Sequence, residues 1–202
     1  MIRFLLIVSF FAFTLSGTQA QTLYIGPKAG LNISSLSFSE GDNDIYGNKL
    51  GINAGAMLIA ELNPMFGVQT ELNLMNMGAS FEFANEDFNL AFSYMEIPLL
   101  ARAKFGDEES LQFFANGGAF LGLLLSANVV DDGDRTEVTE SYNGTNFGLA
   151  FGGGVLIPAG MGKIILDARY GLGISDISDS PASSSEVRTR NFGITAGFLI
   201  DL

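Results

Sequence analysis

Hydrophobic and polar residues alternate along most of this chain, most clearly near its end. From Phe192 to Leu202 every second residue is apolar, and most positions between them are glycine or polar. A period of two predicts a β-strand. An apolar face backed by small and polar residues is the reverse of a soluble barrel strand, whose apolar face points inward. It indicates a barrel whose outside faces lipid.

Seven further segments show the same alternation. With the last strand, residues 190–202, they predict strands at 22–34, 51–62, 66–79, 90–104, 111–125, 145–157 and 163–175. The connections are alternately long and short, as in outer-membrane barrels with long surface loops and short periplasmic turns. We therefore expect an all-β fold, an eight-stranded antiparallel up-and-down transmembrane β-barrel. Pro98 lies within one strand and predicts a bulge or an unpaired position there.

Two segments could also be interpreted as transmembrane helices. Residues 113–130 and 147–162 are rich in Gly, Ala, Leu and Phe, a composition that close-packed membrane helices share. Asn116 and the glycine run 152–154 favour strands instead, as does the clear alternation on either side of each segment.

The N-terminus has the layout of a secretory signal peptide. Arg3 is followed by an apolar run over residues 4–15 and a short segment of small and polar residues that ends at Ala20. This order predicts cleavage between Ala20 and Gln21. We expect a signal peptide at 1–20 and one barrel domain at 21–202; the alternative is an N-terminal helix or strand of the core.

Composition and charge narrow the functional classes. Net charge is −12, and the signal segment holds one basic and no acidic residue, so the mature chain carries −13. This charge argues against nucleic acid as a partner. The chain has no Cys and no His, which removes thiolate metal sites, Cys nucleophiles and a His base. We expect no enzymatic activity and no cofactor, although catalysis by two carboxylates stays formally open.

Acidic loops raise the question of calcium. Asp42, Asp44 and Gly47 match three positions of a calcium-binding loop, but Tyr46 and Asn53 occupy two positions where ligands belong. A second acidic cluster spans 131–134. Solvated turns are the simpler interpretation of both, and calcium binding stays an open alternative.

Charged residues also occur on the inward phase of the predicted strands. Eight strands enclose a lumen that side chains can fill, and charges buried there must be paired. We expect a structural ion-pair network rather than an open pore, with a narrow channel or proton path as the alternative. Its expected members carry both signs: Lys28, Glu71, Glu96, Arg102, Asp167 and Arg169.

Two stretches carry a family resemblance. The segment Gly26-Pro27-Lys28-Ala29-Gly30-Leu31-Asn32, the segment Tyr94-Met95-Glu96-Ile97-Pro98-Leu99-Leu100 and the Ala20-Gln21 junction resemble the PorT-like outer-membrane β-barrel proteins of Bacteroidetes-type bacteria. The resemblance implies an eight-stranded outer-membrane barrel, with some relatives tied to protein secretion. It carries over no functional residues. Many such barrels end in an aromatic residue, whereas this chain ends in Leu202.

Three functions are therefore open. The first is a small non-enzymatic outer-membrane barrel. It would have a structural role, or bind other proteins through its long extracellular loops as a component of a secretion or surface complex. The second is a narrow porin-like conduit for ions or small solutes, and the third a soluble exported barrel that binds an apolar ligand. For the first we expect outer-membrane lipid, the barrel-assembly machinery during insertion, and surface or secretion-complex proteins as partners.

Overall fold

The described part of the chain is built almost entirely from β-strands. The computed structural model describes residues 22–39, 46–83, 86–131, 134–179 and 186–202. The predicted signal peptide and its cleavage site at Ala20 and Gln21 lie outside these residues, as do Asp42 and Asp44. Among the described helices, none is long and apolar enough to cross a membrane. The strands are β1 (Thr22–Phe38), β2 (Tyr46–Glu61), β3 (Phe66–Phe83), β4 (Glu86–Phe105), β5 (Gln112–Asp131), β6 (Asp134–Glu137), β7 (Thr145–Ala159), β8 (Gly162–Gly173) and β9 (Val187–Asp201).

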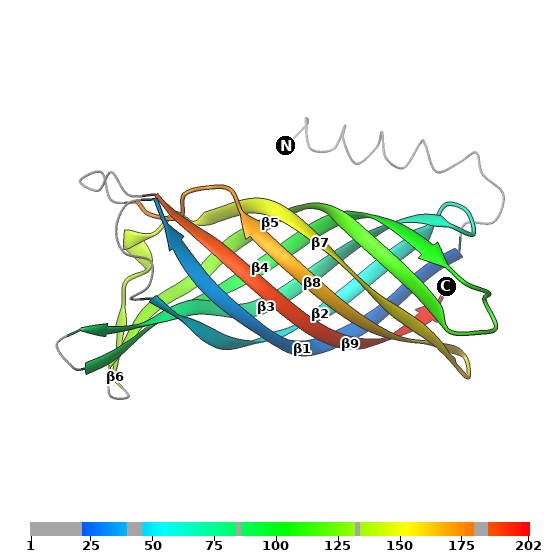
Figure 1. Cartoon of the computed structure of the whole chain (residues 1–202), viewed down its shortest axis with the longest axis horizontal. Coiled ribbons are helices and arrows are strands. Elements are labelled where there is room, and N and C mark those ends of the chain that lie inside the picture. Colours follow the sequence, from blue (N-terminus) through cyan, green and yellow to red (C-terminus); the bar gives the residue numbers. More distant parts are fainter. Residues whose placement is uncertain (1–21, 40–45, 84–85, 132–133, 180–185) are drawn as a thin grey trace.

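Eight of these strands close into a barrel (Figure 1). Each is antiparallel to its neighbours, in the ring order β1, β2, β3, β4, β5, β7, β8, β9, and β9 pairs with β1 to close it. The predicted eight-stranded antiparallel barrel is confirmed. Closure leaves the barrel wall without an unpaired edge, which a bilayer requires because its interior offers the backbone no hydrogen-bonding partners.

The ninth strand, β6, is an addition that the sequence did not predict. Residues 127–144 were expected to form a loop, but β5 runs on to Asp131 and pairs there with β6. At the same end, β1, β2, β3, β4 and β9 also run beyond their predicted bounds. All these extensions lie at one end of the barrel, here called the loop end (Figure 1). The opposite end, the turn end, holds the three short turns and the C-terminus.

The turn between β2 and β3 shows how the sequence sets the turn end. The side-chain Oδ1 of Asn63 accepts hydrogen bonds from the backbone N–H groups of Met65, at 2.9 Å, and Phe66, at 2.8 Å. This arrangement stabilises a tight turn, as predicted. Pro98 leaves an interruption in the β3–β4 ladder, where the positions opposite Ile97 and Pro98 are unpaired while the register on either side is unchanged.

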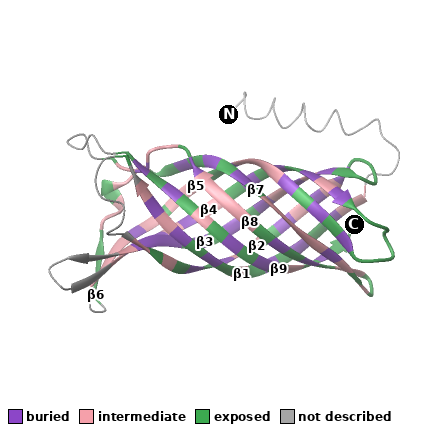
Figure 2. Cartoon of the chain, viewed as in Figure 1, coloured by how far each residue is buried: buried purple, intermediate pink, exposed green. Residues whose placement is uncertain are grey.

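The barrel wall is apolar outside and mixed inside. Buried and exposed residues alternate along the strands (Figure 2), and large apolar side chains such as Leu31, Leu72 and Phe151 are about half exposed on the outer face. Towards the loop end the outward residues become polar: Asn76, Ser93 and Ser126 lie side by side on β3, β4 and β5. Asn76 donates a 3.0 Å hydrogen bond to Ser93. This polar row marks where the apolar band ends.

Candidate functional site

Three layers of side chains fill the lumen. An apolar layer near the turn end contains Tyr24, Met57, Ile59, Phe114, Leu156, Ile165 and Leu199. A larger apolar layer closes the loop end, and a polar layer lies between them. Apolar side chains offer no hydrogen-bond partners, so the buried polar groups between the two apolar layers depend on one another for hydrogen bonds.

Glu71 on β3 is the centre of the polar layer. Arg169 on β8 donates two hydrogen bonds to its carboxylate, Nη1 to Oε2 and Nη2 to Oε1, both at 2.9 Å. Lys28 on β1 forms a third charged contact, and Gln69 and Asn73 donate from the same strand. The Glu71 side chain is fully buried and that of Lys28 is 2% exposed. Five donors therefore hold one carboxylate in a geometry typical of strong, charge-assisted contacts.

Asp167 extends this cluster by one residue. It accepts from Arg169 Nη2 at 3.0 Å and from Asn116 Nδ2 at 3.0 Å. Lys28, Glu71, Asp167 and Arg169, here called the central quartet, thus carry two positive and two negative charges in direct contact. Balanced charge is what a buried ionic cluster needs to offset its desolvation cost.

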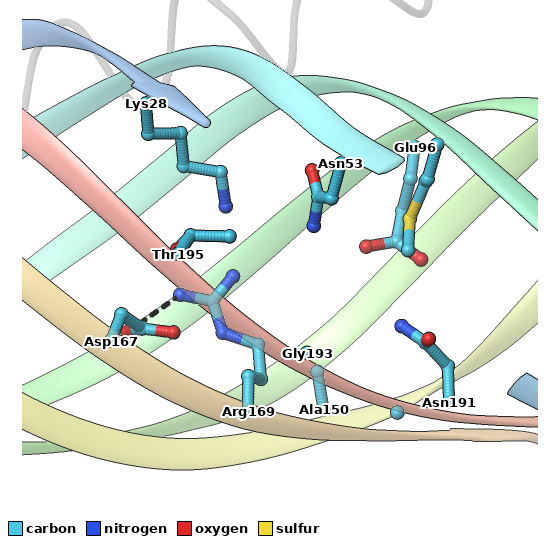
Figure 3. A pocket seen from close by; sticks show the side chains of 11 residues that line it. Lys28, Asn53, Glu96, Ala150, Asp167, Arg169, Asn191, Gly193 and Thr195 are labelled. Carbon is cyan, nitrogen blue, oxygen red and sulfur yellow. Dashed lines mark hydrogen bonds and ion pairs between the residues drawn. The ribbon is translucent and has the colours of Figure 1, made fainter. Parts of the chain in front are cut away.

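Two residues predicted for this network form no ion pair with another described residue. The predicted pairing of Glu96 is wrong: among the described residues, no ion pair or hydrogen bond reaches it. Figure 3 shows Glu96 across a small cavity from Arg169 and Lys28. Both cations are held by Glu71 instead, which explains why Glu96 has no direct partner.

Arg102 is the second residue whose predicted ion pairing differs from the structure. Its Nη1 donates a 2.7 Å hydrogen bond to Gln69 Oε1, and its guanidinium lies 3.7 Å from the centroid of the Phe114 ring. No carboxylate forms an ion pair with it within the part of the chain that the structure describes. A cation over an aromatic face is a favourable contact in a desolvated site, so Arg102 is held by a ring and an amide rather than by an acid.

A second ion pair was not predicted. Lys104 Nζ donates to both carboxylate oxygens of Glu61, each at 2.7 Å, near the turn end. Both residues lie on the inward phase of their strands, so the pattern placed them in the lumen. Only the closed barrel shows that they meet.

The polar layer leaves very little free space. The cavity drawn in Figure 3 has a volume of about 20 Å³ and is lined by Asn53, Glu96 and Thr195 together with members of the central quartet. This is room for about one water molecule. It is far too small for a solute.

The apolar layer at the loop end contains residues from the loops as well as from the strands. It consists of Leu36, Met75, Met77, Ala79, Leu90, Phe92, Tyr94, Ala127, Ile177 and Val187. Ile177 belongs to the segment between β8 and β9 and is fully buried. Backbone hydrogen bonds from Asn143 to Ile177 and from Ile177 to Val187 hold that segment over the barrel mouth. The lumen is therefore closed at this end by a folded cap.

The described residues contain no group of three His, Cys, Asp or Glu side chains placed to hold a metal ion. The open question of calcium concerns the two acidic clusters at 42–47 and 131–134, of which Asp42, Asp44 and Asp132 lie outside those residues.

Solved structures of outer-membrane proteins resemble this chain. OprG from Pseudomonas aeruginosa matches with a TM-score of 0.55 at 13% identity, over 91% of this chain and 98% of that one. Neisserial surface protein A matches with a TM-score of 0.51 at 17% identity, over 90% and 99%. Ail of Yersinia pestis gives 0.49 at 18% identity, over 88% and 99%. At these identities the first two matches show a shared fold.

The family follows from the sequence itself. Among curated proteins, none matches the chain. The profile of the outer membrane protein beta-barrel domain family matches residues 19–179, which is most of the chain. An apolar outer wall of the observed kind rules out the soluble ligand-binding barrel, because such a surface needs lipid around it. The chain belongs to the outer membrane protein beta-barrel domain family and is a protein of the outer membrane, embedded in its lipid.

Proposed function

We propose that this protein is a non-conducting, non-enzymatic barrel that holds an extracellular structure in place for contact with other molecules. The observation that carries the proposal is the sealed lumen. Two apolar layers and a polar layer built around the central quartet fill it, and the cavity in the polar layer has a volume of about 20 Å³. A narrow conduit would need a continuous path of water-lined space, which this packing does not leave.

The strands extend far beyond what the membrane requires. A tilted transmembrane strand needs about 9–11 residues, whereas β3 has 18 and β4 and β5 have 20 each. From the Asn76–Ser93 pair, the β3–β4 ladder continues to the pair of Phe83 and Glu86. At roughly 3.3 Å per residue this is more than 20 Å of paired strand beyond the apolar band. A projection of paired strands beyond the membrane supports a role in recognition.

The chemistry of this projection favours cationic partners. Among the described residues, the stretches that form the loop end contain ten acidic residues and four basic ones: 35–39, 46–49, 80–83, 86–93, 126–131, 134–145, 174–179 and 186–191. Such a surface attracts positively charged partners at long range. A role in a secretion or surface complex fits it and agrees with the PorT-like sequence resemblance. Insertion by the barrel-assembly machinery belongs to the same proposal.

Conductance tests the proposal directly. The refolded protein, reconstituted in planar bilayers, is expected to give no discrete current steps, while a known porin in the same membrane gives them. Reproducible steps from the purified protein would overturn the sealed-lumen proposal and leave the conduit as the function.

A shortened variant tests the recognition role. Residues 78–91 are replaced by Asn-Gly, which joins the strands by a two-residue hairpin turn. The barrel is expected to keep its faster migration on unheated SDS gels, and chemical cross-links to neighbouring proteins on intact cells to be lost. Unchanged cross-links would contradict a recognition role for this hairpin.

A further inference from the structure

The outer wall carries an apolar groove where the first and last strands meet. The groove has a volume of about 450 Å³ and runs over β1 and β9, with Leu50 of β2 and Leu166 of β8 at its sides. Ala29 and Ala196 face each other across the β1–β9 ladder. Their small side chains leave the hollow between larger neighbours such as Leu31 and Ile194.

The groove leads towards two arginines. Arg188 and Arg190 are exposed on β9, and they are the next two residues on the outward face after Ile194 and Phe192, towards the loop end. Opposite them on β1 lie Ser37 and Ser35. From Ala196 to Arg190 the strand rises roughly 20 Å. The apolar part of the groove lies in the membrane, and the arginines lie at its outer boundary.

The charge of these arginines stands out against an acidic surface. They are two of the four basic residues in the loop-end stretches. Arg188 pairs with Glu186, and both side chains are 50% exposed. For Arg190, no ion pair or hydrogen bond is present within the described residues. No described residue occupies the guanidinium of Arg190, which can therefore bind an anion, and Arg188 lies two residues away on the same face of β9.

We propose that the groove and the two arginines form a binding site for an outer-leaflet lipid with a phosphorylated headgroup. An acyl chain lies in the hollow over Ala29 and Ala196, and a headgroup phosphate accepts hydrogen bonds from Arg190 and Arg188. Guanidinium groups match phosphate geometry with two parallel donors. Basic residues at a membrane boundary attract anionic lipid headgroups. The occupant is a lipid rather than free phosphate because the apolar groove continues from the cationic end.

Native mass spectrometry of the folded protein in detergent tests the site. The probes are lipid A with two phosphates and the same lipid with both phosphates removed. The wild type is expected to bind the phosphorylated lipid at least fivefold more tightly, since each basic residue near a membrane surface contributes about that factor. Equal binding of the two lipids would overturn the proposal.

Three variants separate the parts of the site. Arg190→Gln is expected to lower affinity for phosphorylated lipid A about fivefold and to leave affinity for the dephosphorylated lipid unchanged. Ala196→Phe fills the hollow, so it is expected to lower the affinity for both lipids by about the same factor and to keep the preference for the phosphorylated one. Arg135→Gln on the exposed strand β6 is the matched control and is expected to change neither.

Other results would also overturn the proposed lipid site. Arg190→Gln binding like the wild type, or Arg135→Gln losing as much affinity, would show only general attraction to anionic lipid and overturn the site. Displacement of lipid A by millimolar inorganic phosphate would show a phosphate site without a chain groove and also overturn it. Faster migration on unheated SDS gels checks that each variant is folded.

Discussion

Replacing Glu71 by Gln tests the central quartet in the most quantitative way. The change keeps the shape of the side chain but removes the charge that holds Lys28 and two hydrogen bonds from Arg169. Arg169 keeps Asp167 at 3.0 Å, whereas Lys28 loses its only ion-pair partner among the described residues. Breaking a buried pair from one side costs about 3–5 kcal/mol, because it leaves a buried charge uncompensated. We expect Glu71→Gln to lower the free energy of unfolding by this amount.

Two further variants test whether the uncompensated charge of Lys28 causes this loss of stability. Lys28→Met combined with Glu71→Gln restores charge balance, so the double variant is expected to be more stable than Glu71→Gln alone by at least about 2 kcal/mol, because it leaves no uncompensated buried charge. Glu186→Gln breaks the exposed pair with Arg188, whose side chains are both 50% exposed. That loss is expected to be under about 1 kcal/mol.

Urea titration in lipid vesicles measures the free energy of unfolding of the wild type and of the three variants. The folded fraction is followed by the faster band on unheated SDS gels. A loss under about 1 kcal/mol for Glu71→Gln, or a double variant less stable than the single one, would refute the argument that Glu71 neutralises Lys28.

Three more changes probe other parts of the barrel. Gly148 lies opposite Phe120 in the β5–β7 ladder, and a Cβ there would lie 2.3 Å from the backbone oxygen of Leu172 and 2.5 Å from the Phe120 ring. Gly148→Val is therefore expected to cost about 1–3 kcal/mol in the same titration, and a neutral result would contradict this packing. Phe151 is 52% exposed on the outer wall, so Phe151→Arg is expected to cost about 2–4 kcal/mol and Ser126→Arg, at the polar row, under about 1 kcal/mol; equal losses would count against the position of the apolar band. Ile177→Ala is expected to speed protease cleavage of the loop end without changing the unheated gel band, because it loosens the cap and leaves the barrel wall intact; unchanged cleavage would show that Ile177 does not hold the cap.

The barrel wall could be predicted from the sequence because the rule is local. Alternation between lipid and lumen requires only neighbouring residues, so the inward phase of Lys28, Glu71 and Arg169 was evident before the structure. The short turns followed for the same reason, since Asn63 makes its own turn through hydrogen bonds to residues two and three positions on.

The loop-end extensions could not be predicted in this way. Beyond the apolar band both faces of a strand can be polar, so the alternation fades at residues such as Asn76 and Ser93 although the ladder continues. The cap depends on Ile177, an isolated apolar residue in a Ser- and Asp-rich stretch. Its burial arises from long-range contacts that no local pattern encodes.

The pairing inside the lumen depends on how far each strand is staggered against the next. Glu71, Glu96 and Arg102 are all inward in the sequence pattern, but the closed barrel places Glu71 against both cations and Arg102 against Phe114. The stagger is a property of the whole ring. Sequence reasoning therefore predicted which charges enter the lumen but not which of them meet.

The most direct test of the sealed lumen uses the absence of Cys from this chain. Thr195→Cys places a single thiol in the polar layer, where Thr195 is 5% exposed and lines the small cavity. Glu137→Cys places one on the exposed strand β6. In the folded protein a charged maleimide is expected to label Glu137→Cys within minutes and to leave Thr195→Cys unlabelled until the protein is boiled in SDS. Labelling of both at similar rates, with the unheated gel band intact, would show an open lumen and contradict the account.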